Sequence, residues 1–446
     1  MKYCRRILIA SLGLLNGWTV LDAAQTAPIP TNAVVISTEL IRQLAEEART
    51  NHPVLRGAEL RVRMAELGVG SVRTWEDPVA SIGGSAGGKS FRPSEDGDLT
   101  YSIEQKLPLW GKPEAARQTA EASLGIRRAE SEFRRQQSVR NITRGLLMTA
   151  LAERALAITE EDIVWLEATF RTVEVRYRTG QVPLSDALQI QNELAKRHDQ
   201  FESDYNRLAH EQISLNRLLN RAEDIPWPPL LLPELAPVLP FDDELVALAL
   251  KEEPRLKILE AEIREVTAAA ELTRKMRLPD VSLGLEGKQY HGDGGIRSGA
   301  VTLSFSLPLG NADKYRKEYL RELERRNAAE ADRQEQILTI REALHGLSLE
   351  IDAAYRSAVL YGDEIVPRTE QALANRLAEW QAGRGLLREV LDTRRMLLEG
   401  QLLEAQALAT QAEAFANAVL WTGQSKFEDL LPYTVEPSLV PRHNLH

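Results

Sequence analysis

Eight residues fit the pattern of a phosphate-binding loop. Gly83, Gly88, Lys89 and Ser90 occupy the fixed positions of G-x-x-x-x-G-K-S, a motif whose backbone N–H groups and lysine surround a nucleotide phosphate. The motif works only when a helix begins at the lysine, because the helix N-terminus must face the phosphate. Pro93 follows closely and prevents that helix, so the run is better explained as a glycine-rich strand with its outer loop. We expect no nucleotide binding.

The other reactive residue types form no catalytic set. His443 and His446 lie three residues apart near the C-terminus, but stable metal sites recruit three or four ligands. His198 falls on an apolar helical seam and is expected to pack in the core. Cys4 is the single cysteine and only five methionines occur, which excludes a cysteine-ligated metal, a disulfide framework and a thioether ladder for copper. No nucleophile, base and orienting group occur together, so we expect no enzyme, no cofactor and no metal centre.

Composition and the N-terminus indicate an exported protein that does not bind nucleic acid. The 446 residues carry a net charge of -10, whereas nucleic-acid binding requires a basic surface. Lys2, Arg5 and Arg6 precede the apolar run Ile7 to Leu15, and small residues follow, which predicts a cleaved signal peptide over residues 1–24. A membrane-anchoring helix is the alternative, but the run is shorter than the about 20 residues that span a bilayer.

The chain repeats itself at a nearly constant offset. The matched residues are Pro53 with Pro254, Pro78 with Pro279, Pro108 with Pro308, and Gly180 with Gly383, at offsets of 201, 201, 200 and 203. Collinear matches of this kind indicate a tandem duplication, with repeats at 37–222 and 242–424. A proline-rich connector at 223–241 separates the repeats. A tail at 425–446 is predicted to lie against the body or to be disordered.

Each repeat predicts one long helical hairpin. Apolar residues alternate spacings of three and four, the heptad sign of coiled-coil packing. The predicted helices lie at 113–178 and 183–222 in the first repeat, and at 313–381 and 386–424 in the second. The first of them, at 1.5 Å per residue, would reach about 100 Å.

Each repeat also predicts two strands long enough to cross a bilayer. They lie at 79–88, 99–107, 280–290 and 299–307, each about 9 to 11 residues long. Apolar and polar residues alternate along them, which gives the sheet one apolar and one polar face. A soluble, half-buried sheet shows the same alternation.

The export signal and the flanking aromatic residues Trp75, Trp110 and Tyr290 favour a membrane sheet. Four strands cannot close a barrel, and lipid does not tolerate open sheet edges, so other copies must complete the wall. Two copies would give eight strands and three would give twelve, and both numbers are known for such barrels.

These features resemble the TolC-type outer-membrane factor family. The resemblance covers about Ser37 to Gln424 and rests on the duplication, the Leu-Pro-Leu junctions after the strands and two helix-turn signatures, Tyr177 to Leu188 and Trp380 to Asp392. It implies an α+β homotrimer with a helical barrel of long coiled-coil hairpins and a shared transmembrane β-barrel.

The resemblance also implies a function. It predicts a passive export duct in the outer-membrane lipid of a Gram-negative bacterium, with most of the chain in the periplasm. A periplasmic adaptor and an inner-membrane pump of the resistance-nodulation-division type are the implied partners. The junction Gln105 to Lys112 looks most like the heavy-metal cation efflux branch, although the lipid-attachment cysteine of some of its members is missing.

By resemblance, the inner end of the duct is a closed aperture that opens when the hairpins untwist. Glu389 and Asp392 match the acidic aperture positions, lie three apart on one helix face, and would give two rings of three carboxylates in a trimer. Asp186 matches an acid that the family uses in a lock against the other hairpin. Arg384 and Arg388 are the expected local partners of these acids.

Four further residues complete the predicted aperture. Gly180 and Gly383 end the helices at the hairpin turns, where glycine tolerates a positive φ. Tyr177 and Trp380 precede these turns. Trp380 replaces a tyrosine of the family, and its N–H donates but cannot accept a hydrogen bond.

Two alternative functions share these features. An outer-membrane duct for protein secretion of type I has the same architecture. A periplasmic coiled-coil scaffold would use the helices for assembly and fold the strands into a soluble sheet, without a channel.

Overall fold

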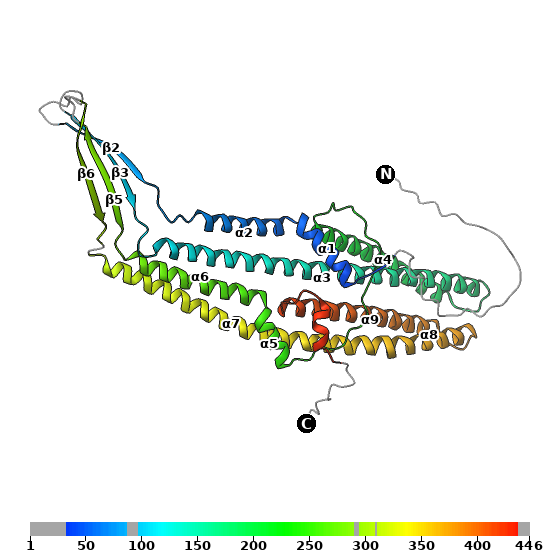
Figure 1. Ribbon diagram of the computed structural model, residues 1–446. Helices are drawn as coiled ribbons and strands as arrows, with labels where there is room; N and C mark the ends of the chain where they lie inside the picture. Colours follow the sequence, from blue (N-terminus) through cyan, green and yellow to red (C-terminus); the bar gives the residue numbers. More distant parts are fainter. Residues whose placement is uncertain (1–32, 87–96, 290–293, 308–309, 436–446) are drawn as a thin grey trace.

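The computed structural model describes residues 33–86, 97–289, 294–307 and 310–435. The predicted signal peptide at 1–24 and the last residues of the tail lie outside these ranges. The described part is elongated, with a four-stranded sheet at one end and the turns of the two helical hairpins at the other (Figure 1).

The two repeats contain equivalent elements in the same order, except that the first long helix of the second repeat is divided in two by a π-helical turn. The first comprises α1 (Thr38–Asn51), α2 (Pro53–Ser71), β2 (Val79–Ala86), β3 (Gly97–Lys106), α3 (Lys112–Arg178) and α4 (Leu184–Leu219). The second comprises α5 (Asp243–Glu252), α6 (Pro254–Met276), β5 (Val281–Gln289), β6 (Ile296–Phe305), α7 (Ala312–Val359), the π-helical turn η1 (Leu360–Ile365), α8 (Val366–Gln381) and α9 (Leu387–Trp421). The predicted fold class, with duplicated long helical hairpins and four strands, is confirmed.

The repeated prolines begin equivalent helices. Pro53 and Pro254 are the first residues of α2 and α6, where the missing N–H costs nothing because that position has no intrahelical acceptor. His52 and Glu253 precede them, and their side chains accept hydrogen bonds from backbone N–H groups of the first turn at 3.3 and 2.5 Å. The proline therefore marks the start of the helix that leads into each strand pair.

The helices lie side by side in the same order as the strands to which they are connected. The sheet order is β2-β3-β5-β6, with every neighbouring pair antiparallel. Below it, α2 contacts α3, α3 contacts α6, and α6 contacts α7 (Figure 1). The chain is therefore a wall of side-by-side elements, whose outer strands β2 and β6 each have one edge without a partner in the described chain.

The junction after β3 ties the first repeat to the second. Trp110 and Gly111 have φ values of 63° and 65°, so the chain turns sharply before α3 begins. The indole Nε1 of Trp110 donates to the carbonyl of Pro279 at 2.8 Å, and Lys112 Nζ lies 2.7 Å from the Asp280 carboxylate. These contacts help to fix β3 beside β5.

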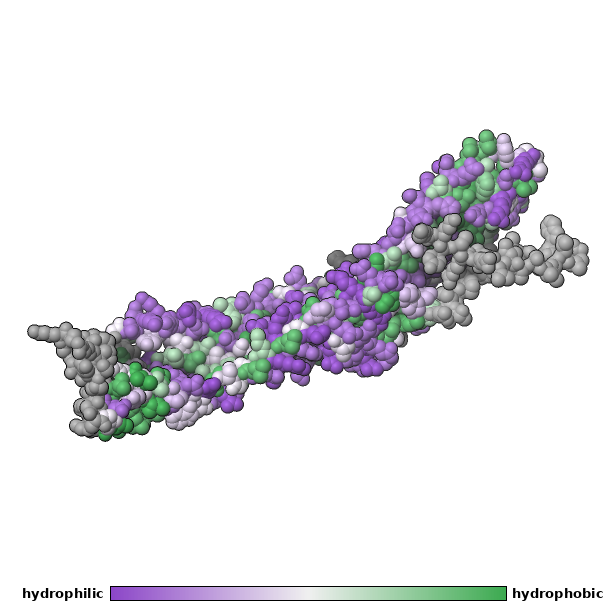
Figure 2. Space-filling model, turned by 90° about the horizontal axis from the view of Figure 1, so that it is seen from above, coloured by the Kyte–Doolittle hydropathy of each residue, from purple (hydrophilic) through white to green (hydrophobic). Residues whose placement is uncertain are grey.

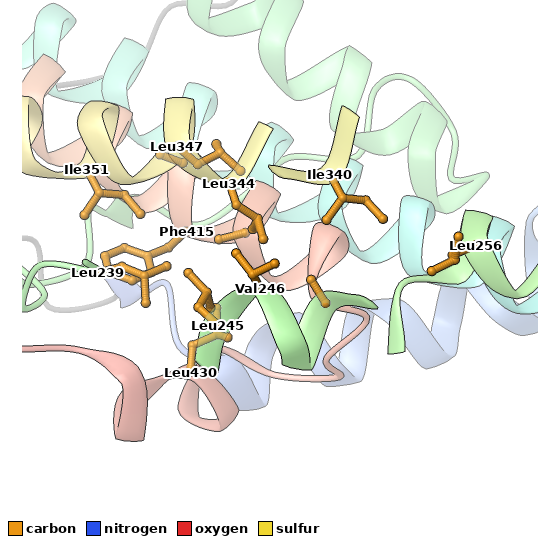
Figure 3. Packing of buried hydrophobic residues seen from close by; sticks show 13 residues of the cluster. Leu239, Leu245, Val246, Leu256, Ile340, Leu344, Leu347, Ile351, Phe415 and Leu430 are labelled. Carbon is orange, nitrogen blue, oxygen red and sulfur yellow. The ribbon is translucent and has the colours of Figure 1, made fainter. Parts of the chain in front are cut away.

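A large apolar cluster occupies the middle of the molecule. It combines residues of α5, α6, α7 and α9 with the connector and the tail, and Phe415 of α9 lies beside Leu239 of the connector (Figure 3). Its buried members are Leu239, Leu245, Val246, Ala249, Leu256, Ile340, Leu344, Leu347, Ile351, Ala414, Phe415, Ala418 and Leu430. The short helices thus thicken the wall at mid-height and bury one face of the long helices there.

The connector and the tail are both packed against the middle of the molecule. In the connector, β4 (Leu230–Leu231) pairs in parallel with β1 (Val34–Val35). The tail forms the 3-10 helix η2 (Phe427–Tyr433), whose Phe427 ring packs edge-on against Phe415 at 5.0 Å. Up to residue 435 the tail therefore lies against the body, one of the two predicted outcomes, and residues 436–446 are outside the described part.

The structure departs from the predicted helix at 313–381 about two thirds of the way along it. The helix is interrupted by the π-helical turn η1, and α8 continues beyond it. Pro367 explains the break, because proline has no N–H and its ring clashes with the carbonyl four residues earlier, that of Asp363. The turn also brings Gly362 against α9, where a Cβ would lie 2.9 Å from the carboxylate of Glu404.

The expectation that His198 packs in the core is wrong for the single chain, because its side chain is exposed. α4 packs mainly on α3, and its buried apolar residues are Ala187, Ile190, Leu215 and Leu219. A heptad seam therefore predicted the helix but not which seam positions are covered within one chain.

Replacing Leu344 by alanine tests the mid-height cluster. Leu344 is 1% exposed, so Leu344→Ala should lower the free energy of unfolding by about 2–5 kcal/mol through lost burial and a cavity. Denaturant unfolding of the detergent-solubilised protein measures this. Glu342→Ala, an exposed position on the same helix, should change stability by less than about 0.5 kcal/mol. Equal effects of the two changes would show that the cluster does not stabilise the fold.

Candidate functional site

Both hairpins end in the same glycine-centred turn. Gly180 and Gly383 have φ values of 73° and 75°, and no atom lies within 4 Å of a Cβ built on either. The Gly180 N–H bonds to the Tyr177 carbonyl at 2.9 Å, and the Gly383 N–H bonds to the Trp380 carbonyl at 3.0 Å. Glycine is needed here for the left-handed backbone alone, since the surrounding space is open.

The two turns are held together by Arg176, which the sequence did not single out. Arg176, in the last turn of α3, donates to the carbonyls of Trp380 and Gln381 at 3.0 and 2.6 Å. Its guanidinium carbon lies 4.7 Å from the centre of the Trp380 ring. A cation placed on the carbonyls at the end of α8 also complements the helix dipole. The first hairpin therefore caps a helix of the second.

The equivalent residues Tyr177 and Trp380 have different surroundings. Tyr177 is 42% exposed, whereas Trp380 is 3% exposed and packs with Leu373, Leu387 and Val390. Trp380 thus anchors the second turn by apolar burial and by accepting the Arg176 hydrogen bond through its backbone. The sequence predicted that both aromatic residues lie at the turns but not that only one is buried.

The acids Glu389 and Asp392 lie on the first turns of α9, half exposed, and each has arginine partners in its own hairpin. Arg376 of α8 lies 2.9 Å from Glu389. Arg395 lies 2.9 Å from Asp392, and the predicted partner Arg388 is farther away at 3.7 Å. Such exposed pairs contribute little to stability, but they partly neutralise the carboxylates.

The other two predicted charges lie apart from these acids within one chain. Asp186 stands in the first turn of α4, where its negative charge is stabilised by the helix N-terminus, and its carboxylate accepts a hydrogen bond from the Ser185 hydroxyl at 3.4 Å. Among the described residues, neither Asp186 nor Arg384 forms an ion pair. Within the part of the chain that the structure describes, no lock therefore joins Asp186 to the second hairpin.

A second cross-hairpin contact lies above the turns. Glu193 of α4 is 8% exposed and lies 2.7 Å from Arg395 of α9 and 3.2 Å from Lys196. Burial raises the pKa of this carboxyl, but the two cationic partners outweigh it and hold the pKa below its ordinary value. Arg395 therefore bridges a tip acid, Asp392, and the first hairpin. The Arg394-Arg395 pair on a heptad helix was the available sequence signal.

The phosphate-loop pattern lies only partly within the described residues, and the metal candidates His443 and His446 lie outside them. Gly83 to Ala86 belong to β2, while the lysine and serine of the pattern lie outside the described residues. Among residues whose placement is described, no group of three or more His, Cys, Asp or Glu side chains could hold a metal ion.

The opposite end of the molecule carries an exposed apolar sheet face. Apolar side chains gather at this end, while the helical body is mixed and largely hydrophilic (Figure 2). The strand register places most of the exposed apolar residues on one face: Ile82, Leu99, Tyr101, Ile103, Leu283, Leu285, Val301, Leu303 and Phe305. The other face carries Ser81, Thr100, Ser102, Glu104, Ser282, Glu286, Thr302 and Ser304. A sheet with an exposed apolar face of this size calls for an apolar environment.

None of the described helices is both long and apolar enough to span a membrane.

Comparison with known proteins gives a consistent picture. A family model described as outer membrane efflux protein matches residues 44–221 and 245–424. The pyoverdine export outer membrane protein OpmQ of Pseudomonas putida is 22% identical over 435 residues, covering 89% of each chain. The solved outer-membrane channel OprN has a TM-score of 0.75 at 18% identity, covering 87% of this chain and 90% of its own. The outer membrane protein VceC of Vibrio cholerae has a TM-score of 0.73 at 18% identity, covering 87% and 97%.

Replacing a turn glycine and a helix glycine by alanine should change the stability of the protein in opposite directions. Gly383→Ala places a Cβ in a left-handed turn and should destabilise the protein by about 1–2 kcal/mol, whereas Gly383→Asn should cost less. Gly346 lies within α7 with open space around it, so Gly346→Ala should stabilise by about 0.5–1 kcal/mol. Denaturant midpoints compare them. A stabilising Gly383→Ala would contradict the turn geometry.

Proposed function

Because the chain belongs to the outer membrane efflux protein family, we propose that three copies of it enclose one passive export duct. The protein is an outer-membrane efflux channel of a Gram-negative bacterium, with its helical part in the periplasm, and it is not an enzyme. Channels of this family work with periplasmic adaptors and inner-membrane pumps and are homotrimers.

The observation that carries the proposal is the wall with two open edges. β2 and β6 lack an outer partner in the described chain, yet an unpaired strand edge is not tolerated in lipid. Pairing β6 of one copy with β2 of the next satisfies both edges, and three copies of four strands give a closed barrel of twelve. The apolar face would then face lipid and the polar face a water-filled lumen.

The helices support the same closure. They follow the lateral order of the strands, so the strand that pairs with a neighbouring copy continues into a helix that meets that copy as well. Exposed apolar residues on the long helices, such as Leu320, Leu338 and Leu349 of α7, would be covered there. A periplasmic scaffold without a channel would leave the apolar sheet face in water.

The turns at the far end support an aperture. Glu389, Asp392 and Asp186 stand close to Gly383 and Gly180, and three copies would bring them around one axis as rings of carboxylates. Tyr177, Trp380, Arg384 and Arg388 would surround these rings. We propose that Asp186 meets its lock partner across the boundary between copies, since none of the described residues of its own chain pairs with it.

Heavy-metal cations are the cargo that we propose, together with a pump of the resistance-nodulation-division type. The support is the resemblance of the junction Gln105 to Lys112 to the metal-efflux branch, and carboxylate rings that attract cations. OpmQ, by its name, exports pyoverdine, so a related chain serves a different cargo. Loss of the gene should raise sensitivity to divalent metals if the proposed cargo is correct, and unchanged metal sensitivity would exclude it.

Removing the tip acids tests the aperture. In planar bilayers, Glu389→Ala combined with Asp392→Ala should lower the preference for cations over anions and weaken block by divalent ions. The change removes six carboxylates from a trimer, two in each of three copies. Asp352→Ala is the matched control, because Asp352 is similarly exposed and paired with Arg356 at 3.0 Å but lies on α7. Unchanged selectivity would remove these acids from the conduction path.

A charge on either face of one strand tests the membrane orientation of the sheet. Leu285 lies at the centre of β5 on the apolar face and is 56% exposed, while Glu286 points to the other face. Leu285→Arg should destabilise the membrane-inserted protein by about 2–4 kcal/mol, and Glu286→Arg should be tolerated. The yield of folded trimer from the outer-membrane fraction measures this. Equal yields for both variants would contradict a lipid-facing apolar surface.

A further inference from the structure

A buried carboxylate joins the two hairpins well above their turns. Asp162 of α3 is 2% exposed. It lies 18 residues before Gly180 (180 - 162 = 18), which is about 27 Å along an α-helix. A carboxylate is stable in such a place only when its charge is paired and its oxygens accept hydrogen bonds.

Both oxygens of Asp162 have guanidinium partners, and these come from different helices. Arg197 of α4 lies 2.7 Å from Oδ2, and Arg394 of α9 lies 2.9 Å from Oδ1. The guanidinium of Arg394 also lies 5.2 Å from the ring centre of Trp165 on α3. The two arginine side chains are themselves 26% and 14% exposed. One carboxylate therefore holds three helices, two from the first hairpin and one from the second.

A neighbouring buried carboxylate lacks this cross-hairpin contact. Asp204 of α4 is 9% exposed and accepts hydrogen bonds from Thr159 and Gln200, both at 2.8 Å. Its partners are neutral and belong to the first hairpin. Asp204 can therefore stabilise that hairpin but cannot hold the second hairpin against it.

We infer that Asp162 is a positioning residue for the aperture, which through Arg394 holds α9 against the first hairpin and so sets the separation of the tip carboxylates. Asp392 lies two residues before Arg394 on α9, and Glu389 lies five residues before it. A shift of α9 at Arg394 therefore moves both acids. This inference rests on the proposed function as a duct. It identifies residues distant from the turns that govern the width of the aperture.

The charges predict an asymmetry between the two partners. Loss of the Asp162 charge leaves Arg197 and Arg394 close together without the carboxylate between them, and like charges in a poorly solvated site repel. Loss of the Arg394 charge leaves Asp162 paired with Arg197. Asp162→Asn should therefore separate the hairpins more than Arg394→Met does.

Single-channel recording in planar bilayers tests this with the full-length trimer. Asp162→Asn should raise the open probability or the resting conductance by about fivefold or more, in the range of typical coupling energies. Arg394→Met should produce a smaller increase. Asp162→Glu keeps the charge and should behave like the wild type. Asp204→Asn is the matched control and should leave conduction unchanged.

Hydrogen exchange provides a second readout that requires no conduction. Amides of α9 around Arg394, from Leu391 to Leu398, donate hydrogen bonds within the helix, so they should exchange faster in Asp162→Asn than in the wild type, and at the wild-type rate in Asp204→Asn. If Asp162→Asn forms no trimer, Arg394→Met answers the same question by the same two measurements.

The outcomes separate the inference from the proposed function. If the wild-type trimer conducts, and Asp162→Asn or Arg394→Met shows the same conduction and the same hydrogen exchange as the wild type, the inference is overturned and the proposed duct stands. Equal effects of Asp162→Asn and Asp204→Asn would also overturn it, because they would indicate general destabilisation. A wild-type trimer that never conducts would refute the proposed duct, and hydrogen exchange would still decide whether Asp162 holds the hairpins together.

Discussion

Backbone hydrogen bonding at the sheet edges is the constraint on which this molecule depends. Each chain supplies four strands with an exposed apolar face, and the outer edges of β2 and β6 have no partner in the described chain. Water could form hydrogen bonds with those strand edges, but exposing the apolar face to water is unfavourable. Lipid is a favourable environment for the apolar face but offers no hydrogen bonds to the edges. A closed wall of several copies meets both demands, so membrane insertion and assembly are one problem for this chain.

The long helices extend that constraint far from the membrane. They follow the same lateral order as the strands, and α3 has 67 residues, which is about 100 Å of continuous helix. Such a wall has little core of its own, and its largest apolar cluster lies at mid-height, where the short helices, connector and tail cover it. Toward the turns, apolar packing around Trp380 is supplemented by ionic contacts between the hairpins.

Those ionic contacts occur where the two repeats have diverged. With the offset of 203 at the turns, Arg176 corresponds to Glu379 (176 + 203 = 379), Asp162 to Ile365, and Gln191 to Arg394. Identical hairpins would present like charges to each other, whereas diverged hairpins can present an arginine to a carboxylate or to helix-end carbonyls. The duplication therefore supplies two similar hairpins, and a few substitutions make them complementary.

The amino-acid sequence by itself determined the duplication, the two hairpins, the four strands and the glycine turns, because period, proline and glycine act over a few neighbouring residues. It also indicated the family through short motifs at the turns and junctions. It did not reveal the break near Pro367, the exposure of His198, or the contacts that Arg176, Arg376 and Asp162 make. These depend on which helix faces which, a relation between residues up to 232 positions apart that only packing in three dimensions decides.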